Sequence, residues 1–117
     1  MQYLCLIYQD EAAAAERPKA ELDRIYAEYI DFTADIRKAG RLAGVNRLQP
    51  ARTAATVRVR DGNVVATDGP FAETKEQLGG YYLIEARDLN DAIQTAARIP
   101  SARFGSVEVR PIWEMQI

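Results

Sequence analysis

The residue types that could do chemistry in this chain are carboxylates, lysine, arginine and tyrosine, because the sequence has no histidine and one cysteine, Cys5. Histidine is the commonest general base near neutral pH and the commonest metal ligand. Its absence excludes Ser-His and Cys-His nucleophile pairs and an ordinary zinc site. No phosphate loop or dinucleotide fingerprint is present either. We therefore predict no bound metal and no cofactor, and we expect Cys5 to be a small buried hydrophobe.

The segment Asp68-Gly69-Pro70-Phe71 is the first candidate for a site, and two interpretations of it remain open. In the functional one, Asp68 lies at the mouth of a cleft, desolvated enough to act as an acid or base. In the structural one, the tetrapeptide is a turn: Asp68 accepts backbone N–H bonds, Gly69 takes positive φ and Pro70 fixes the exit. The segment opens a polar stretch, residues 68–80, which we expect to be a long loop with one helical turn across 73–77. Long loops in compact domains are often functional.

Charged residues near this loop and on a late strand are further candidates. Glu73 and Lys75 either supply a carboxylate and an ammonium group to a ligand or form a solvated face with weak ion pairs. Arg110 either grips a carboxylate or phosphate group of a ligand, or pairs with Glu85 or Glu108 to hold the sheet or a dimer together.

Two adjacent tyrosines supply the aromatic candidates. Tyr81 and Tyr82 point to opposite faces of a predicted strand, so one of them can enter the cleft. In one hypothesis, Tyr82 stacks on an aromatic ligand in a cleft that is lined by Asp68, Phe71, Tyr82 and Arg110. The alternative is packing in the core or in an interface, where tyrosine buries its ring and keeps its hydroxyl bonded.

Strands and helices that position these residues follow from hydrophobic periodicity. Apolar residues recur at spacings of three and four along one helix between Pro18 and Gly40, namely Leu22, Ile25, Tyr29, Phe32 and Ile36, widened by Tyr26, Ile30 and Thr33. A second helix begins at its N-cap Asp88, with Asp91 in the capping-box position, and ends before Pro100. Residues 10–17 are ambiguous between a helical turn and a loop. The predicted strands cover residues 2–8, 42–49, 56–60, 64–67, 81–86 and 106–113.

The order of these elements predicts one α+β domain over residues 1–117. Alternation on both sides of Asp61-Gly62 predicts a β-hairpin. Without that inserted hairpin, the order is the split β-α-β, or ferredoxin-like, arrangement, with both helices on one side of a four-stranded antiparallel sheet. Strands 2–8 and 81–86 are apolar on both faces, so the open face needs a cover. A second copy of the chain, in a homodimer, is the simplest one.

Charge and hydropathy exclude several classes of partner. A net charge of -2 and a pI near 5.2 argue against nucleic acid and anionic membrane surfaces, which attract basic proteins. No apolar run approaches the roughly 20 residues that span a bilayer. The N-terminus lacks the pattern of a signal peptide, and one cysteine suits a reducing compartment. We therefore expect a cytoplasmic protein with no nucleic-acid or membrane partner.

Three stretches resemble the YCII-related (DGPF) family: Val57-Arg58-Val59-Arg60-Asp61-Gly62, then Thr67-Asp68-Gly69-Pro70-Phe71-Ala72-Glu73-Thr74-Lys75-Glu76, then Leu78-Gly79-Gly80-Tyr81-Tyr82. The ending Val107-Glu108-Val109-Arg110-Pro111 is also similar to that family. The likeness covers nearly the whole chain. It implies a ferredoxin-like fold that pairs into a dimeric α/β barrel.

The resemblance also implies candidate functions. Some relatives are thought to use a His-Asp pair, and at least one is a dehalogenating lyase; here Asp68 matches the aspartate and no histidine completes the pair. Family genes often lie beside those of extracytoplasmic-function sigma factors, which implies a regulatory partner. We predict a homodimer that binds a small anionic or aromatic molecule near Gly69, Pro70 and Phe71. The alternatives are an interaction protein linked to a sigma factor and a lyase that uses Asp68.

Overall fold

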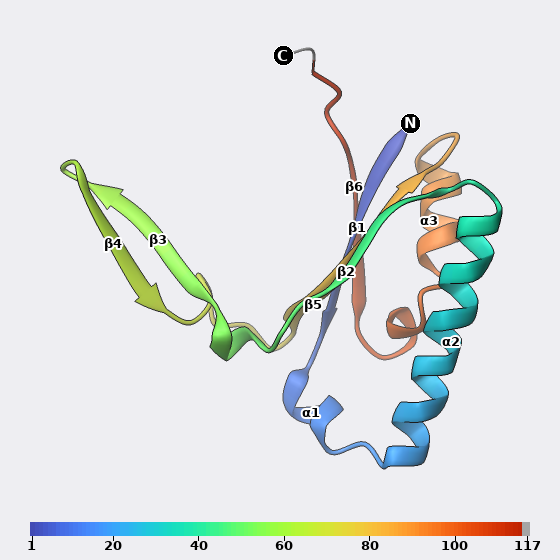
Figure 1. The fold of residues 1–117 in the computed structure, drawn as a ribbon, viewed down its shortest axis with the longest axis horizontal. Coiled ribbons are helices and arrows are strands. Elements are labelled where there is room, and N and C mark those ends of the chain that lie inside the picture. The colour runs from blue at the N-terminus through green and yellow to red at the C-terminus, as the bar shows by residue number, and fades with distance from the viewer. Residues whose placement is uncertain (116–117) are drawn as a thin grey trace.

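The computed structural model describes residues 1–115 and has an α+β architecture of two antiparallel sheets and three helices (Figure 1). The strands are β1 (Gln2–Gln9), β2 (Leu42–Arg47), β3 (Ala55–Arg60), β4 (Asn63–Asp68), β5 (Gln77–Glu85) and β6 (Ser106–Pro111). The helices are α1 (Glu11–Ala15), α2 (Lys19–Lys38) and α3 (Leu89–Ala96), with 3-10 turns at Ala51–Thr53 and Pro100–Arg103. No helix within residues 1–115 is both long and apolar enough to cross a membrane.

The main sheet has four antiparallel strands in the order β2-β5-β1-β6. This order is compatible with the predicted ferredoxin-like arrangement, because the two central strands are the first and third of the four in sequence. Strands β3 and β4 form a separate two-stranded sheet, inserted between β2 and β5. Figure 1 shows α2 and α3 on one side of the main sheet and the β3–β4 hairpin on the other.

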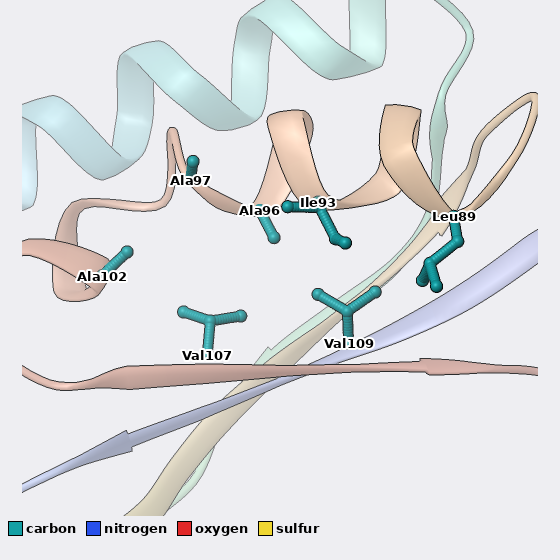
Figure 2. A pocket seen from close by; sticks show the side chains of 7 residues that line it. All are labelled: Leu89, Ile93, Ala96, Ala97, Ala102, Val107 and Val109. Atoms are coloured by element: carbon teal, nitrogen blue, oxygen red, sulfur yellow. The ribbon is translucent and has the colours of Figure 1, made fainter.

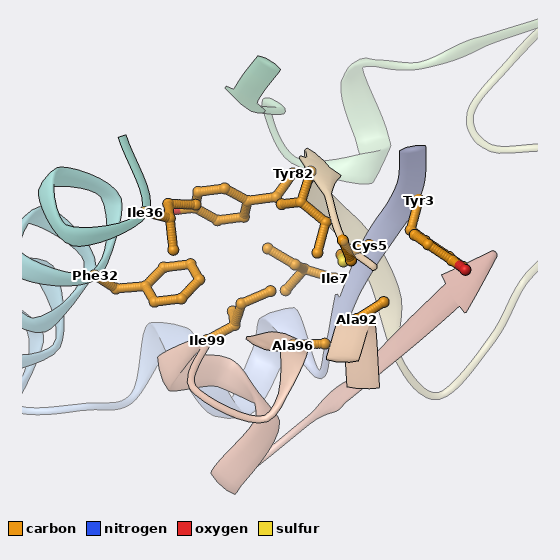
Figure 3. Close-up of a cluster of buried hydrophobic side chains, with 11 residues drawn as sticks. Tyr3, Cys5, Ile7, Phe32, Ile36, Tyr82, Ala92, Ala96 and Ile99 are labelled. Atoms are coloured by element: carbon orange, nitrogen blue, oxygen red, sulfur yellow. The ribbon is translucent and has the colours of Figure 1, made fainter. Parts of the chain in front are cut away.

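Side-chain alternation on β1 builds the core beneath the helices. Tyr3, Cys5 and Ile7 are buried, as is Ile84 on β5, and they meet side chains from α2, α3 and the segment after α3 (Figure 3). The ring of Phe32 from α2 stands edge-on to Tyr82, with centroids 5.2 Å apart. Cys5 has no exposed surface, and burial raises the pKa of its thiol to about 11. The prediction of a buried Cys5 is confirmed.

Helix α2 covers the sheet with a narrower stripe than its sequence predicts. Phe32 and Ile36 are buried, whereas Leu22, Tyr26 and Ile30 are exposed, so the prediction that these three belong to the buried stripe is wrong. The helix shares one sheet face with α3, and therefore only part of its apolar surface reaches the strands.

Helix α3 begins at the predicted cap. The Asp88 carboxylate accepts a hydrogen bond from the backbone N–H of Asp91 at 2.8 Å. The Asp91 carboxylate in turn accepts one from the backbone N–H of Arg87 at 2.9 Å and pairs with the Arg41 guanidinium at 2.5 Å. These contacts, led by the Arg87 N–H, lower the pKa of Asp91 from 3.8 to about 2. Asp91 thus ties the start of α3 to the beginning of β2 through Arg41.

One predicted helical turn and two predicted strand ends need correction, and one open alternative is resolved. The helical turn predicted across residues 73–77 is absent, because that segment is irregular and β5 begins within it at Gln77. The strands predicted to end at residues 49 and 113 end at Arg47 and Pro111, since boundaries depend on pairing rather than on propensity. The ambiguous segment after β1 contains the short helix α1, whose N-cap Asp10 accepts from the N–H groups of Ala12 and Ala13.

The predicted hairpin is confirmed at its Asp-Gly turn. Asp61 has φ of 52° and Gly62 has φ of 77°, as a two-residue turn between twisted antiparallel strands requires. The register pairs Arg60 with Asn63 and Val59 with Val64, so the two strands are paired immediately on either side of the turn.

Candidate functional site

The sheet face that no helix covers is built by the alternate residues of the same strands. Leu4 and Leu6 of β1 are half-buried and lie beside Leu83 and Tyr81 of β5. Beside them on β6, Arg110 and Glu108 are in register with the same two leucines. This surface, called the open face from here on, has an apolar centre and a charged edge.

A change of register at one end of the sheet brings Leu78 toward the open face. Ile7 pairs with Gly80, but the next residue, Tyr8, pairs with Leu78, so one residue of β5 is left over. A β-bulge of this kind redirects the side chains beyond it. Tyr8 continues the alternation of Leu4 and Leu6, and its cross-strand partner Leu78 therefore lies on the same side.

A pocket of about 530 Å³ lies where the open face meets the base of the hairpin. Four segments supply its walls: the end of β1, the connection from β2 to β3, the segment after β4 and the start of β5. Its lining residues are Tyr8, Leu48, Gln49, Pro50, Ala51, Thr53, Ala54, Pro70, Phe71, Ala72, Thr74, Gln77 and Leu78. This lining contains apolar and neutral polar side chains and no charged one.

Hydrogen bonds fasten these walls to one another. The backbone N–H of Leu48 donates to the carbonyl of Gly79 at 2.9 Å, which joins the β2–β3 connection to β5. Glu11 bridges two walls: its N–H donates to the Gln77 side chain, and its carboxylate accepts from the N–H of Ala51, both at 2.9 Å. The Gln77 amide also donates to the carbonyl of Thr74 at 2.6 Å. The pocket therefore has a preorganised frame.

Two polar groups in this lining are available to a ligand. Within residues 1–115, neither the Tyr8 hydroxyl nor the Gln49 amide makes a side-chain hydrogen bond, whereas Gln77, Thr53 and Thr74 are engaged with their neighbours. An apolar pocket with a few such groups is the usual form of a small-molecule site, because the polar groups orient what the apolar surface binds.

The Asp-Gly-Pro-Phe segment forms a turn at the rim of this pocket. Gly69 has φ of 96°, a conformation that suits glycine, and its N–H donates to the carbonyl of Ala54 at 2.7 Å, which closes the base of the hairpin. Pro70 and Phe71 line the pocket. Asp68 is exposed at the end of β4 and is outside the lining. The structure thus places the apolar half of the tetrapeptide, not its carboxylate, at the pocket.

The other candidates from the sequence lie apart from the pocket. Glu73 and Lys75 are exposed in the loop that follows Phe71. Tyr82 is buried beneath α2, where its hydroxyl shares a 2.6 Å hydrogen bond with Thr33 and burial raises its pKa. Arg110 is exposed on the open face and pairs with Glu108. The ion pair between Arg110 and Glu108, which was the structural alternative for Arg110, is therefore present. Tyr82 packs in the core, as its structural alternative predicted.

A second apolar groove, of about 480 Å³, lies between α3 and β6 (Figure 2). Leu89 and Ile93 of α3 face Val107 and Val109 of β6 across it, and three alanines complete it. It offers no polar side chain to orient a ligand, and so it is the weaker candidate. Within residues 1–115, no three side chains of histidine, cysteine, aspartate or glutamate gather as a metal site would require.

The sequence did not identify most of the residues that build the pocket. Tyr8, Leu48, Gln77 and Leu78 were absent from the candidates because strand periodicity assigns them to a sheet or a connection, not to a wall. Two signals were available. Gly79-Gly80 in a strand pattern marks a bulge or a close approach of backbones, and Pro50 at the end of a predicted strand marks an irregular connection.

Comparison with known proteins gives two matches. The family model described as YCII-related domain matches residues 1–116. An uncharacterized protein from Rhizobium meliloti (strain 1021) is 40% identical over 114 residues, which cover 96% of this chain and 92% of that protein. Both matches extend over nearly the whole chain, so the hairpin and the pocket lie within the matched region.

Proposed function

This chain belongs to the YCII-related family, and from its pocket and its open face we propose that it binds a small aromatic molecule beside Phe71, within a homodimer. The observation that carries the proposal is the pocket itself. Its volume of about 530 Å³ falls within the range of roughly 300–1,000 Å³ that is usual for small-molecule sites.

The lining favours an aromatic ligand over a highly charged one. Leu48, Phe71 and Leu78 offer apolar surface and one exposed ring on which another ring can stack. The hydroxyl of Tyr8 and the amide of Gln49 can bond a single polar substituent. An anionic group would lack a cationic partner among the lining side chains, and burying it there would cost free energy.

A second copy of the chain is proposed as the cover of the open face. Leu4, Leu6 and Leu83 are half-buried on this face of the described chain, with charged residues confined to its edge. Two such faces packed together would give the dimeric α/β barrel that the family resemblance implies. The pocket lies at one end of the same face, so the proposed dimer and the proposed ligand occupy one side of the molecule.

The two alternatives from the sequence have less support. A lyase that uses Asp68 needs this carboxylate at the bound substrate, and Asp68 lies outside the pocket lining. A regulatory partner such as a sigma factor is an expectation from the family resemblance alone. Ligand binding therefore comes first in the proposal.

A thermal-shift experiment with defined probes tests the binding proposal. The probes are indole, phenol, benzoate and inorganic phosphate, each in a concentration series against the unmodified chain. A ligand at 100 times its Kd adds about 2.7 kcal/mol to the free energy of unfolding, which raises the Tm of a domain this size by several degrees. We expect indole or phenol to raise the Tm more than benzoate, and phosphate to leave it unchanged.

Matched variants locate the effect. Phe71→Ala removes the exposed ring from the pocket, whereas Trp113→Ala removes an exposed ring outside it. The shift should vanish in the first and persist in the second. In Asp68→Asn the shift should also persist; its loss there would favour the Asp68 alternative. An unmodified chain whose Tm rises with none of the four probes would contradict the binding proposal.

A further inference from the structure

The β3–β4 hairpin carries an apolar face that nothing in the described chain covers. Its register pairs Val57 with Ala66 and Val59 with Val64, and alternation puts these side chains on one face. The exposed fractions of Val57, Val59 and Val64 are 63%, 58% and 73%. The opposite face carries Arg58 and other polar residues, so the hairpin is amphipathic.

An amphipathic hairpin with a bare apolar face is unstable alone in water. A two-stranded hairpin is at best marginally stable in isolation, and exposed clusters of apolar side chains mark contact surfaces. The hairpin is tied to the rest of the chain at its base, through Gly69 N–H to the Ala54 carbonyl at 2.7 Å and the Thr56 hydroxyl to the Gly69 carbonyl at 3.0 Å. The valines beyond this base need a partner.

The position of the hairpin indicates which partner. It projects on the side of the sheet opposite the helices, which is the side of the open face (Figure 1). The four strands of the main sheet have 8, 6, 9 and 6 residues, so at about 3.3 Å per residue and 4.8 Å between strands the open face has an outline of roughly 460 Å². A standard interface buries about 800 Å² on each partner. The outline of the open face is smaller than this area, and the hairpin would add apolar surface beside it.

We propose that the β3–β4 hairpin is an intermolecular arm whose Val57, Val59 and Val64 pack against the second copy of the chain. The inference rests on the proposed homodimer and adds to it a second contact, distinct from the open face. The second copy then also lies over the pocket at the base of the arm. Phe71, whose exposed fraction is 81%, is covered in this way, and the ligand site is completed by the partner chain.

Two glutamate variants of the hairpin test this proposal. Val59→Glu puts a charge on the apolar face, and Val65→Glu puts the same charge on the opposite face, where Arg58 is its cross-strand neighbour. The dimer dissociation constant of each variant and of the unmodified chain is measured by analytical ultracentrifugation over a concentration series. A charge buried at an interface is costly, so we expect Val59→Glu to raise the Kd at least about tenfold and Val65→Glu to change it less than about threefold.

The outcomes separate this inference from the proposed function. An unmodified chain that dimerises, with a Kd that Val59→Glu leaves unchanged, overturns the arm and leaves the open-face dimer standing; the valines would then be free for another protein. Equal weakening by both glutamates also overturns it, because the effect would come from damage to the hairpin itself. An unmodified chain that stays monomeric overturns the homodimer and the arm together, while the thermal shift with indole tests the pocket separately.

Discussion

The two faces of the main sheet are made by the same strands and have different roles. On β1, Cys5 lies under the helices with no exposed surface, and its neighbour Leu6 lies half-buried on the open face. The helix-covered side is closed by apolar packing and fixed by Asp91 and Arg41. The open side carries the pocket, the exposed apolar face of the hairpin and the exposed ring of Phe71. This difference shows that one side is closed by packing within the chain, whereas the other side presents exposed apolar surface, where the proposed ligand and the proposed second copy would bind.

The largest expected difference in stability is between alanine variants of two adjacent residues of β5. Ile84→Ala leaves a cavity under the helices and should lower the free energy of unfolding by about 2–5 kcal/mol. Leu83→Ala, on the open face, should cost about 1 kcal/mol in the isolated chain, because that side chain is already partly exposed to water. Urea denaturation at several protein concentrations measures both.

In that experiment, the loss from Leu83→Ala should grow with protein concentration, because the proposed dimer would lose a contact that the monomer does not have. The loss from Ile84→Ala should be the same at all concentrations. If the two variants lost the same free energy of unfolding at every protein concentration, the proposed difference between the two faces would be contradicted.

Thiol labelling compares the faces at a single residue. Cys5 is buried, and its pKa is raised from 9.0 to about 11, so the reactive thiolate is about 100-fold scarcer than in an ordinary cysteine. At pH 8, we expect labelling by iodoacetamide to be at least about 100-fold slower in the native chain than in the same chain unfolded in urea. Similar rates in both states would show that the helix-covered side opens readily.

A smaller effect on stability is expected from the pH-dependent contacts of Asp91 at the start of α3. The pKa of Asp91 is lowered from 3.8 to about 2 on folding, so its contribution to stability is present above pH 4 and is lost as the pH falls toward 2. Asp91→Asn should be less stable at neutral pH and should show a shallower decline between pH 5 and pH 2. In Arg41→Gln, Asp91 keeps the hydrogen bond from the Arg87 N–H. The decline of its stability with falling pH should therefore be intermediate between those of Asp91→Asn and the unmodified chain. An Asn variant whose decline matches that of the unmodified chain would contradict this assignment.

Much of the fold could be predicted from the sequence because it depends on local signals. Helix α3 begins at its Asp88 cap, the hairpin turns at Asp61-Gly62, and the alternation of β1 gives its two faces. The exposed flank of α2 was missed, since periodicity shows which residues share a helix face but not how much of that face the sheet can cover.

The candidate site was predicted less well, for a related reason. The sequence identified the segment Asp68-Gly69-Pro70-Phe71, and two of its residues line the pocket. The remaining walls come from parts of the chain that are far apart, and the bulge at Tyr8 and the bridge made by Glu11 help to bring them together. The pair Gly79-Gly80 is a local signal of the bulge but does not show which residues it brings together, and the Glu11 bridge has no local signal, because both contacts depend on how the strands pair.

The central claim, that the open face binds a second copy of the chain, is tested most directly by sedimentation equilibrium. The unmodified chain is compared with Leu6→Arg on the open face and with Leu22→Arg, the same substitution at an exposed position on α2. We predict twice the 13.1 kDa chain mass for the unmodified protein and for Leu22→Arg at micromolar concentration, and the single-chain mass for Leu6→Arg. A mass of 13.1 kDa for the unmodified chain at every concentration, or a dimer that survives Leu6→Arg, would contradict the account.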